Sequence, residues 1–168
     1  MSAYGQEVNT TSSGPAPDRP QLILGFTGSR FTPDARTVDR LYGHLDRLGE
    51  YAHGFVTGAC RGLDAIIGEY YAEKFPGRHH LVIMPANESF TDRWWLPFGH
   101  AVQVINMPPG TTYKDRNQAI VDNSNQLVGF PIGAEDDPRQ RRSGTWQTIR
   151  MGRRAHPTPP VILRLDTL

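Results

Sequence analysis

Two glycine-rich segments lie about 30 residues apart, and each directly follows a short apolar run. The first, Gly25–Arg30 (GFTGSR), follows Leu22–Leu24, and the second, Thr57–Asp64 (TGACRGLD), follows Gly54–Val56. Glycines at strand ends let backbone N–H groups approach a ligand, and the N-terminus of the next helix favours an anion. Two such loops on neighbouring parallel strands predict a phosphate-binding crevice, and therefore a nucleotide or nucleotide-derived ligand.

The side chains within these two loops suit the same ligand. Ser29 is able to donate to a phosphate oxygen, and Arg30 to pair with one through its planar fork. Asp64, in the first turn of a helix, is expected to have a mixed role: to cap that helix, and to hold a ribose hydroxyl or orient the loop. Neither loop has the Gly-x-Gly-x-x-Gly pattern of dinucleotide sites, and the chain lacks a Walker-type Gly-Lys-Ser/Thr. We therefore expect no cofactor and no P-loop nucleotidase.

Two later segments open helices with polar residues. In the first, Asp115–Asn117, Arg116 is placed to reach a phosphate and Asn117 a base or sugar, although a polar helix start alone would also explain them. In the second, Ser143, Gly144 and Thr145 present N–H groups and hydroxyls at a helix start. This second segment predicts a third anion cradle.

Two carboxylates are candidate catalytic groups, Asp64 and Glu88. Glu88 follows the third predicted strand at the ligand edge, although a loop glutamate is often only solvated. The six histidines show no ligand spacing with carboxylates, so we expect no metal site. The residues expected at the ligand are Thr27, Gly28, Ser29, Arg30, Gly58, Ala59, Arg61, Gly62, Asp64, Arg116, Asn117, Ser143, Gly144 and Thr145.

Short apolar strands alternate with amphipathic helices along most of the chain. Strands are predicted at 22–26, 54–57, 80–84, 101–105, 126–130 and 161–165, and helices at 33–49, 63–75, 113–123 and 143–154. This alternation predicts an α/β fold: a single Rossmann-like domain over 21–168, with a mainly parallel sheet and helices on both faces. Ligands of such sheets bind beyond the carboxyl ends of the strands, where the loops above fall. Residues 1–20, rich in Ser, Thr, Gly and Pro, predict a disordered tail.

Composition narrows the class of partner. A net charge of +1 argues against a generally cationic nucleic-acid binder, although the arginine run 139–154 could form a local basic patch. With one cysteine no intrachain disulfide forms, which fits a cytoplasmic protein. No apolar run approaches the roughly 18 residues of a membrane span, so no membrane partner is expected. Homo-oligomerisation is expected, with Trp94, Trp95 and Phe98 as candidate contacts.

The four motifs, taken in order, resemble the SLOG superfamily. They are Thr27–Arg30 (TGSR), Thr57–Asp64, Asp115–Asn117 (DRN) and Ser143–Trp146 (SGTW), and the likeness runs from about 21 to 165. That superfamily includes the DNA-processing protein A family and the Lonely Guy phosphoribohydrolases, and the chain is most similar to its small single-domain YspA-like members. The resemblance implies a Rossmann-like sheet whose ligand contacts Gly28, Ser29, Gly58, Gly62, Asp64, Asn117, Ser143, Gly144 and Thr145.

One departure from that family bears on activity. Lonely Guy enzymes carry a Pro-Gly-Gly-x-Gly-Thr-x-x-Glu motif that binds phosphate and supplies a catalytic glutamate. Gly144 and Thr145 keep the phosphate-binding pair, but Thr148 stands at the position of the glutamate. A carboxylate from elsewhere, Glu88 being the choice, would have to replace it.

Three functions follow from these observations. The first is a module that binds a nucleotide, such as a signalling nucleotide, without turning it over. The second is an N-glycosidic-bond hydrolase acting on nucleoside monophosphates or related ribosyl phosphates, in which a carboxylate stabilises the ribosyl centre. The third is a single-stranded DNA-binding protein that uses the arginine run and Trp146. Whether the chain is an enzyme stays open at this point.

Overall fold

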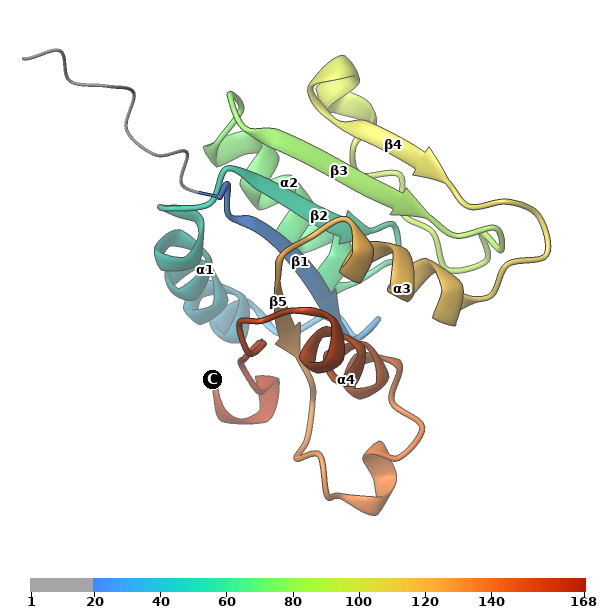
Figure 1. Cartoon of the computed structure of the whole chain (residues 1–168). Coiled ribbons are helices and arrows are strands. Elements are labelled where there is room, and N and C mark those ends of the chain that lie inside the picture. The colour runs from blue at the N-terminus through green and yellow to red at the C-terminus, as the bar shows by residue number, and fades with distance from the viewer. Residues whose placement is uncertain (1–19) are drawn as a thin grey trace, which may run out of the picture.

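Six parallel strands form one open sheet in the order β4-β3-β2-β1-β5-β6 (Figure 1). The computed structural model describes residues 20–168. The strands are β1 (Ile23–Gly28), β2 (Gly54–Gly58), β3 (His79–Met84), β4 (Gln103–Asn106), β5 (Gln126–Phe130) and β6 (Val161–Ile162). The order reverses between β1 and β5, and this is the switch point beside which ligands bind in such sheets. The predicted α/β, Rossmann-like fold is confirmed.

Helices cover both faces of this sheet, as predicted. On one face lie α1 (Ala35–Gly49) and α2 (Leu63–Lys74), and on the other α3 (Tyr113–Asp122) and α4 (Gly144–Ala155) (Figure 1). Alternate residues of each strand supply the two cores, because successive side chains of a strand point to opposite faces. In β2, Phe55 packs with the α1–α2 core, whereas Val56 packs with the α3–α4 core.

The ends of some elements differ from the sequence prediction. The first helix begins at Ala35 rather than at Pro33, because Asp34 caps it and accepts a hydrogen bond from the Thr37 N–H at 2.8 Å. The predicted strand 101–105 begins only at 103, after a short 3₁₀ helix, Leu96–Ala101. The strand predicted at 161–165 is only two residues long, because another 3₁₀ helix, Leu165–Thr167, begins soon after it. A third 3₁₀ helix, Pro138–Gln140, interrupts the polar loop before α4.

The tryptophan pair lies in the core rather than at a surface. Trp94 and Trp95 are only 4% and 6% exposed and pack with the side chains beneath α2, including Val82. Any side chain at Gly68 of α2 would overlap the Trp94 ring. Half-buried Phe98 packs edge-on against Trp94, with ring centroids 6.1 Å apart. The two tryptophans are thus unavailable as surface contacts between subunits, and homo-oligomerisation stays a prediction.

Two further expectations concern the N-terminal tail and helices that could cross a membrane. The predicted tail falls almost entirely on residues 1–19, which are outside the described residues. Across residues 20–168, no helix has the length and apolar character needed to cross a membrane.

Candidate functional site

A cavity of about 340 Å³ opens at the carboxyl ends of the strands, the edge predicted to bind the ligand. The loops after β1 and β2 and the N-terminal turns of α3 and α4 form its walls. The lining residues are Phe26, Thr27, Gly28, Ser29, Arg30, Cys60, Asp64, Tyr113, Arg116, Asn117, Ile120, Ile132, Gln140, Ser143, Gly144 and Thr145. The Thr27–Arg30 and Ser143–Trp146 motifs thus contribute four and three residues to one cavity, and the Asp115–Asn117 and Thr57–Asp64 motifs contribute two each.

The predicted site residues divide into two groups. Those that line the cavity are Thr27, Gly28, Ser29, Arg30, Asp64, Arg116, Asn117, Ser143, Gly144 and Thr145. Those that do not are Gly58, Ala59, Arg61, Gly62 and Glu88. Of this second group, Ala59 is fully buried in the apolar cluster that contains Trp94 and Trp95.

Asp64 and Arg116 form a buried ion pair in the cavity wall. The Arg116 Nη1 lies 3.1 Å from the Asp64 Oδ2, and both side chains are 8% exposed. The same Oδ2 accepts the Cys60 backbone N–H at 3.1 Å, and Arg116 Nη2 donates to the Cys60 Sγ at 3.3 Å. Burial has the largest single influence on the pKa of Arg116 and lowers it, but the charges of Asp64 and Cys60 and the hydrogen bonds to both together outweigh burial, so the pKa is raised. Burial and the Asp64 charge both raise the pKa of the Cys60 thiol.

Two glycines of the second loop make this arrangement fit. A side chain at Gly58 would overlap both the Asp64 carboxylate and the Arg116 guanidinium, so the glycine admits the ion pair. Gly62 has a φ of +86°, and a Cβ there would lie 2.5 Å from the Arg30 carbonyl oxygen. Both glycines therefore shape the cavity wall without lining the cavity.

Arg61 and Glu88 make contacts outside the cavity. Arg61 is exposed; its backbone N–H donates to the Phe90 carbonyl at 2.8 Å, and its Nη2 donates to the Ser89 carbonyl at 3.2 Å. It therefore fastens the segment after β3. Glu88 is about half exposed, and its carboxylate pairs with Arg93 at 2.8 Å. This contact gives no reason to place the Glu88 carboxylate at the ligand.

Three nearly buried polar side chains face the cavity without a partner. Thr27, Asn117 and Thr145 are 6%, 8% and 7% exposed, and none of these side chains makes a hydrogen bond within residues 20–168. Their polar atoms open onto the cavity rather than being enclosed in the core, so they are accessible to a ligand. At the same place, the Ser143 Oγ caps α4 by accepting the Trp146 N–H at 3.3 Å. The Gly144 and Thr145 N–H groups in the first turn of α4 have no intrahelical partner.

Arg30 is held by aromatic rings at the cavity mouth. Its guanidinium carbon lies 4.0 Å from the centroid of the Phe90 ring and 4.6 Å from that of Tyr113. No ion pair within residues 20–168 includes Arg30. Its charge is therefore not compensated by a carboxylate of the described chain.

Some cavity-lining residues were not singled out from the sequence. Tyr113 precedes the Asp115–Asn117 motif by two residues, and an aromatic residue at a ligand-facing helix start is a signal that could have drawn attention to it. Gln140 lies in the polar loop before Ser143, where nothing in the sequence distinguishes it from its neighbours. Thr148, at the position of the Lonely Guy glutamate, is fully buried and donates to the Gly144 carbonyl at 2.8 Å.

Metal-ligating groups are not gathered in the described part of the chain. Over residues 20–168, no cluster of three or more His, Cys, Asp or Glu side chains is placed to hold a metal ion.

The fold has a counterpart among solved structures, although no family model and no curated protein matches the sequence. DNA processing protein A from Helicobacter pylori, whose structure was described for its single-stranded DNA binding mode, is similar with a TM-score of 0.51 and 17% identity. The match covers 80% of this chain and 61% of that one, so the chain spans less than two thirds of its neighbour. This likeness shows the fold alone and supports the fold neighbourhood expected from the SLOG resemblance. The YspA-like group stays a prediction.

Proposed function

We propose that this protein binds a nucleotide or nucleotide-derived ligand in the cavity at the carboxyl edge of the sheet, without turning it over. The observation that carries the proposal is the set of unpartnered, nearly buried side chains of Thr27, Asn117 and Thr145. Each hydrogen bond that a ligand makes to one of these groups contributes roughly 0.5–1.5 kcal/mol to its affinity. A ligand rich in hydroxyl, phosphate and base heteroatoms is able to make such bonds.

The charges around the cavity favour an anionic group on that ligand. The first turn of α4 offers the N–H groups of Gly144 and Thr145 at the positive end of a helix dipole. Arg30 adds a cation that no carboxylate within the described residues neutralises. Arg116 contributes less charge, because Asp64 already pairs with it. We therefore place the phosphate near α4 and Arg30, with Asn117 at the sugar or base.

Hydrolysis of the N-glycosidic bond is the alternative that the cavity supports less well. Among the described residues that line it, Asp64 is the only carboxylate, and its Oδ2 already accepts from Arg116 and from the Cys60 N–H. Glu88 pairs with Arg93 outside the lining, and Thr148 brings no acid. A free carboxylate to stabilise a ribosyl cation is thus lacking from the described cavity wall, which supports binding over turnover.

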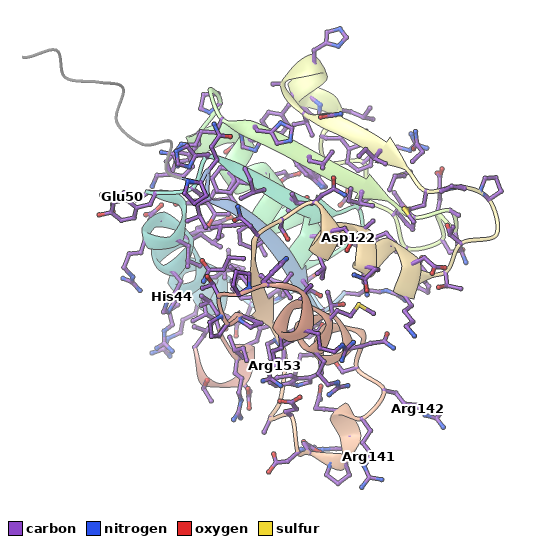
Figure 2. The ribbon with its side chains drawn as sticks, in the orientation of Figure 1. His44, Glu50, Asp122, Arg141, Arg142 and Arg153 are labelled. Atoms are coloured by element: carbon purple, nitrogen blue, oxygen red, sulfur yellow. The ribbon has the colours of Figure 1, made fainter. Side chains whose placement is uncertain are left out.

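Single-stranded DNA is a lesser alternative, favoured by two exposed arginines near the cavity. Figure 2 shows Arg141 and Arg142 on the loop before α4, pointing away from the body of the protein. The single-stranded DNA binding of DNA processing protein A, the structural neighbour, agrees with this hypothesis. Against it, Arg150 and Arg153 of the same run pair with Glu135 at 3.3 and 2.8 Å, which reduces the free positive charge.

Calorimetric titration with a nucleotide panel tests the proposal. The panel contains nucleoside mono-, di- and triphosphates, cyclic nucleotides and a single-stranded oligonucleotide, and each mixture is afterwards separated by chromatography. We expect one nucleotide class to bind and to be recovered intact. Asn117→Ala should weaken that binding about tenfold, the loss of one or two hydrogen bonds. Gln118→Ala is the matched control, since the neighbouring amide donates to Asp122 instead.

Each other outcome assigns a different function. Release of free base would support the hydrolase and contradict binding without turnover. If only the oligonucleotide bound tightly, and its binding weakened steeply with salt, the result would support single-stranded DNA binding as the function. If no member of the panel bound, or if Asn117→Ala and Gln118→Ala bound equally well, the cavity would not be the nucleotide site.

A further inference from the structure

Phe90 and Tyr113, which come from separate segments, contact the same arginine side chain. We propose that they are positioning residues, which hold the Arg30 guanidinium in one orientation to receive the phosphate of the ligand; this inference rests on the proposed function of the cavity. Phe90 lies on the segment 85–93 after β3, and Tyr113 is the first residue of α3. Arg30 follows β1, so two loops and the start of α3 meet at this point of the carboxyl edge.

The contacts restrain Arg30 while leaving its donors free. A guanidinium that lies over an aromatic ring keeps its N–H groups in its own plane, where they are able to pair with two phosphate oxygens. The Arg30 carbon is 4.0 Å from the Phe90 centroid and 4.6 Å from the Tyr113 centroid. Arg30 is otherwise solvent-exposed and unpaired within the described chain. Holding it in place before binding reduces the entropy lost when the ligand arrives.

The segment that carries Phe90 is itself fastened to its surroundings. Arg61 donates to the carbonyls of Ser89 and Phe90, and the Asp92 N–H donates to the Ala59 carbonyl at 2.8 Å. The Tyr113 hydroxyl donates to the Asn87 carbonyl at 2.9 Å, so the second ring is tied to the same segment. Phe90 thus sits on fixed backbone although its side chain is 40% exposed. This gives Arg61 a role in the site that does not require contact with the ligand.

Core packing does not account for the position of Phe90. Its ring belongs to none of the three apolar clusters around the sheet, and the side chains over it are the charged Arg30 and, at 5.8 Å, Arg61. Phe31, the residue after Arg30, is also exposed, at 59%, but neither lines the cavity nor contacts a guanidinium. The two phenylalanines therefore form a matched pair for a test.

Calorimetric titration with inorganic pyrophosphate provides that test, because this probe has phosphate oxygens and no base. Phe90→Leu keeps an apolar side chain and removes the ring, and it should weaken pyrophosphate binding about threefold to fivefold. Phe90→Trp should restore binding to within about twofold of wild type, since Trp gives the strongest cation–π contact. Phe31→Leu should bind as wild type does. Thermal melting of each variant checks that the fold is kept, and Tyr113→Leu serves as a second ring deletion.

A double-mutant cycle separates positioning from a general structural effect. In an Arg30→Lys background, which lacks the planar fork, Phe90→Leu should reduce affinity by less than about 1.5-fold further. An equal loss in both backgrounds, or no loss in Phe90→Leu, would overturn the inference while leaving the proposed function standing. Binding of nucleotides but not of pyrophosphate would also overturn the inference alone. Failure of wild type to bind either probe would overturn both.

Discussion

Asp64 and Arg116, 52 positions apart in the sequence, form a buried ion pair whose Nη1–Oδ2 distance is 3.1 Å. The pair joins the start of α2 to the start of α3 across the end of β2, and Gly58 leaves the space that it occupies. The Cys60 N–H donates to the same Asp64 Oδ2, and the Cys60 thiol accepts from the Arg116 Nη2. This pair therefore fixes the relative position of two cavity walls.

Asp64→Asn should destabilise the protein strongly. The substitution keeps the shape of the side chain but leaves the Arg116 charge buried without a counterion, which costs about 3–5 kcal/mol. Urea denaturation measures the loss. Asp166→Asn is the control, because its pair with Arg164 is more than one third exposed and should be worth less than about 1 kcal/mol. Similar losses in the two variants would contradict a structural role for the Asp64 pair.

Gly58→Ala should also be destabilising, by about 2 kcal/mol or more. The added methyl group would fall on the Asp64 carboxylate and 2.8 Å from the Arg116 Cζ, so the ion pair would have to move apart. Gly43→Ala in α1 has no atom within 4 Å of the new Cβ. That control should stabilise the helix by roughly 0.5–1 kcal/mol. If thermal melting showed the same sign for both variants, the space at Gly58 would not be needed by the pair.

The buried thiol of Cys60 should make stability depend on alkaline pH. Its pKa is raised in the folded protein by burial and by Asp64, so the unfolded chain loses this proton first as the pH rises. Stability from this group is complete below the unfolded pKa of about 8.5 and declines as the pH rises above it. Urea unfolding at pH 7 and pH 9.5 should show a larger decline for wild type than for Cys60→Ser, whose hydroxyl does not ionise. Equal declines would mean that the folded thiol titrates normally.

The sequence was sufficient to predict the fold and the edge that carries the cavity. Strand–helix alternation is a local pattern, and parallel strands place their carboxyl ends together, so the sequence predicts Ser29, Asn117 and Thr145 at one edge, where all three line the cavity. What sequence patterns do not contain is the direction of each side chain. Glu88 follows β3 at that edge, yet its carboxylate pairs with Arg93 in solvent.

The less regular segment between β3 and β4 was the hardest to predict. Nothing periodic in residues 86–100 indicates that Trp94 and Trp95 pack beneath α2, and the contact of Trp94 with that helix depends on Gly68. The pairing of Arg61 with the carbonyls of Ser89 and Phe90 is likewise a contact between distant loops. Arg61 therefore looked like a ligand residue from its motif, whereas its contacts in the structure are with backbone.

Two threonines with unpartnered hydroxyls allow ligand binding to be separated from stability. The Thr57 hydroxyl is buried, makes no hydrogen bond within residues 20–168 and does not line the cavity, whereas that of Thr145 faces the cavity. Thr57→Val should stabilise the protein by about 1 kcal/mol, because it removes an unsatisfied buried group, and should leave nucleotide binding unchanged. Thr145→Val should change stability by less than about 0.5 kcal/mol and weaken binding about tenfold.

Calorimetry and urea denaturation on the same two variants check both halves of this prediction. Thr148→Val is the further control, since its hydroxyl already donates to the Gly144 carbonyl in the same helix as Thr145. It should lose about 1 kcal/mol of stability without loss of binding. If Thr145→Val bound the ligand as tightly as wild type, the free hydroxyl in the cavity would have no part in recognition. The phosphate would then have to be held by Arg30 and the α4 N–H groups without it.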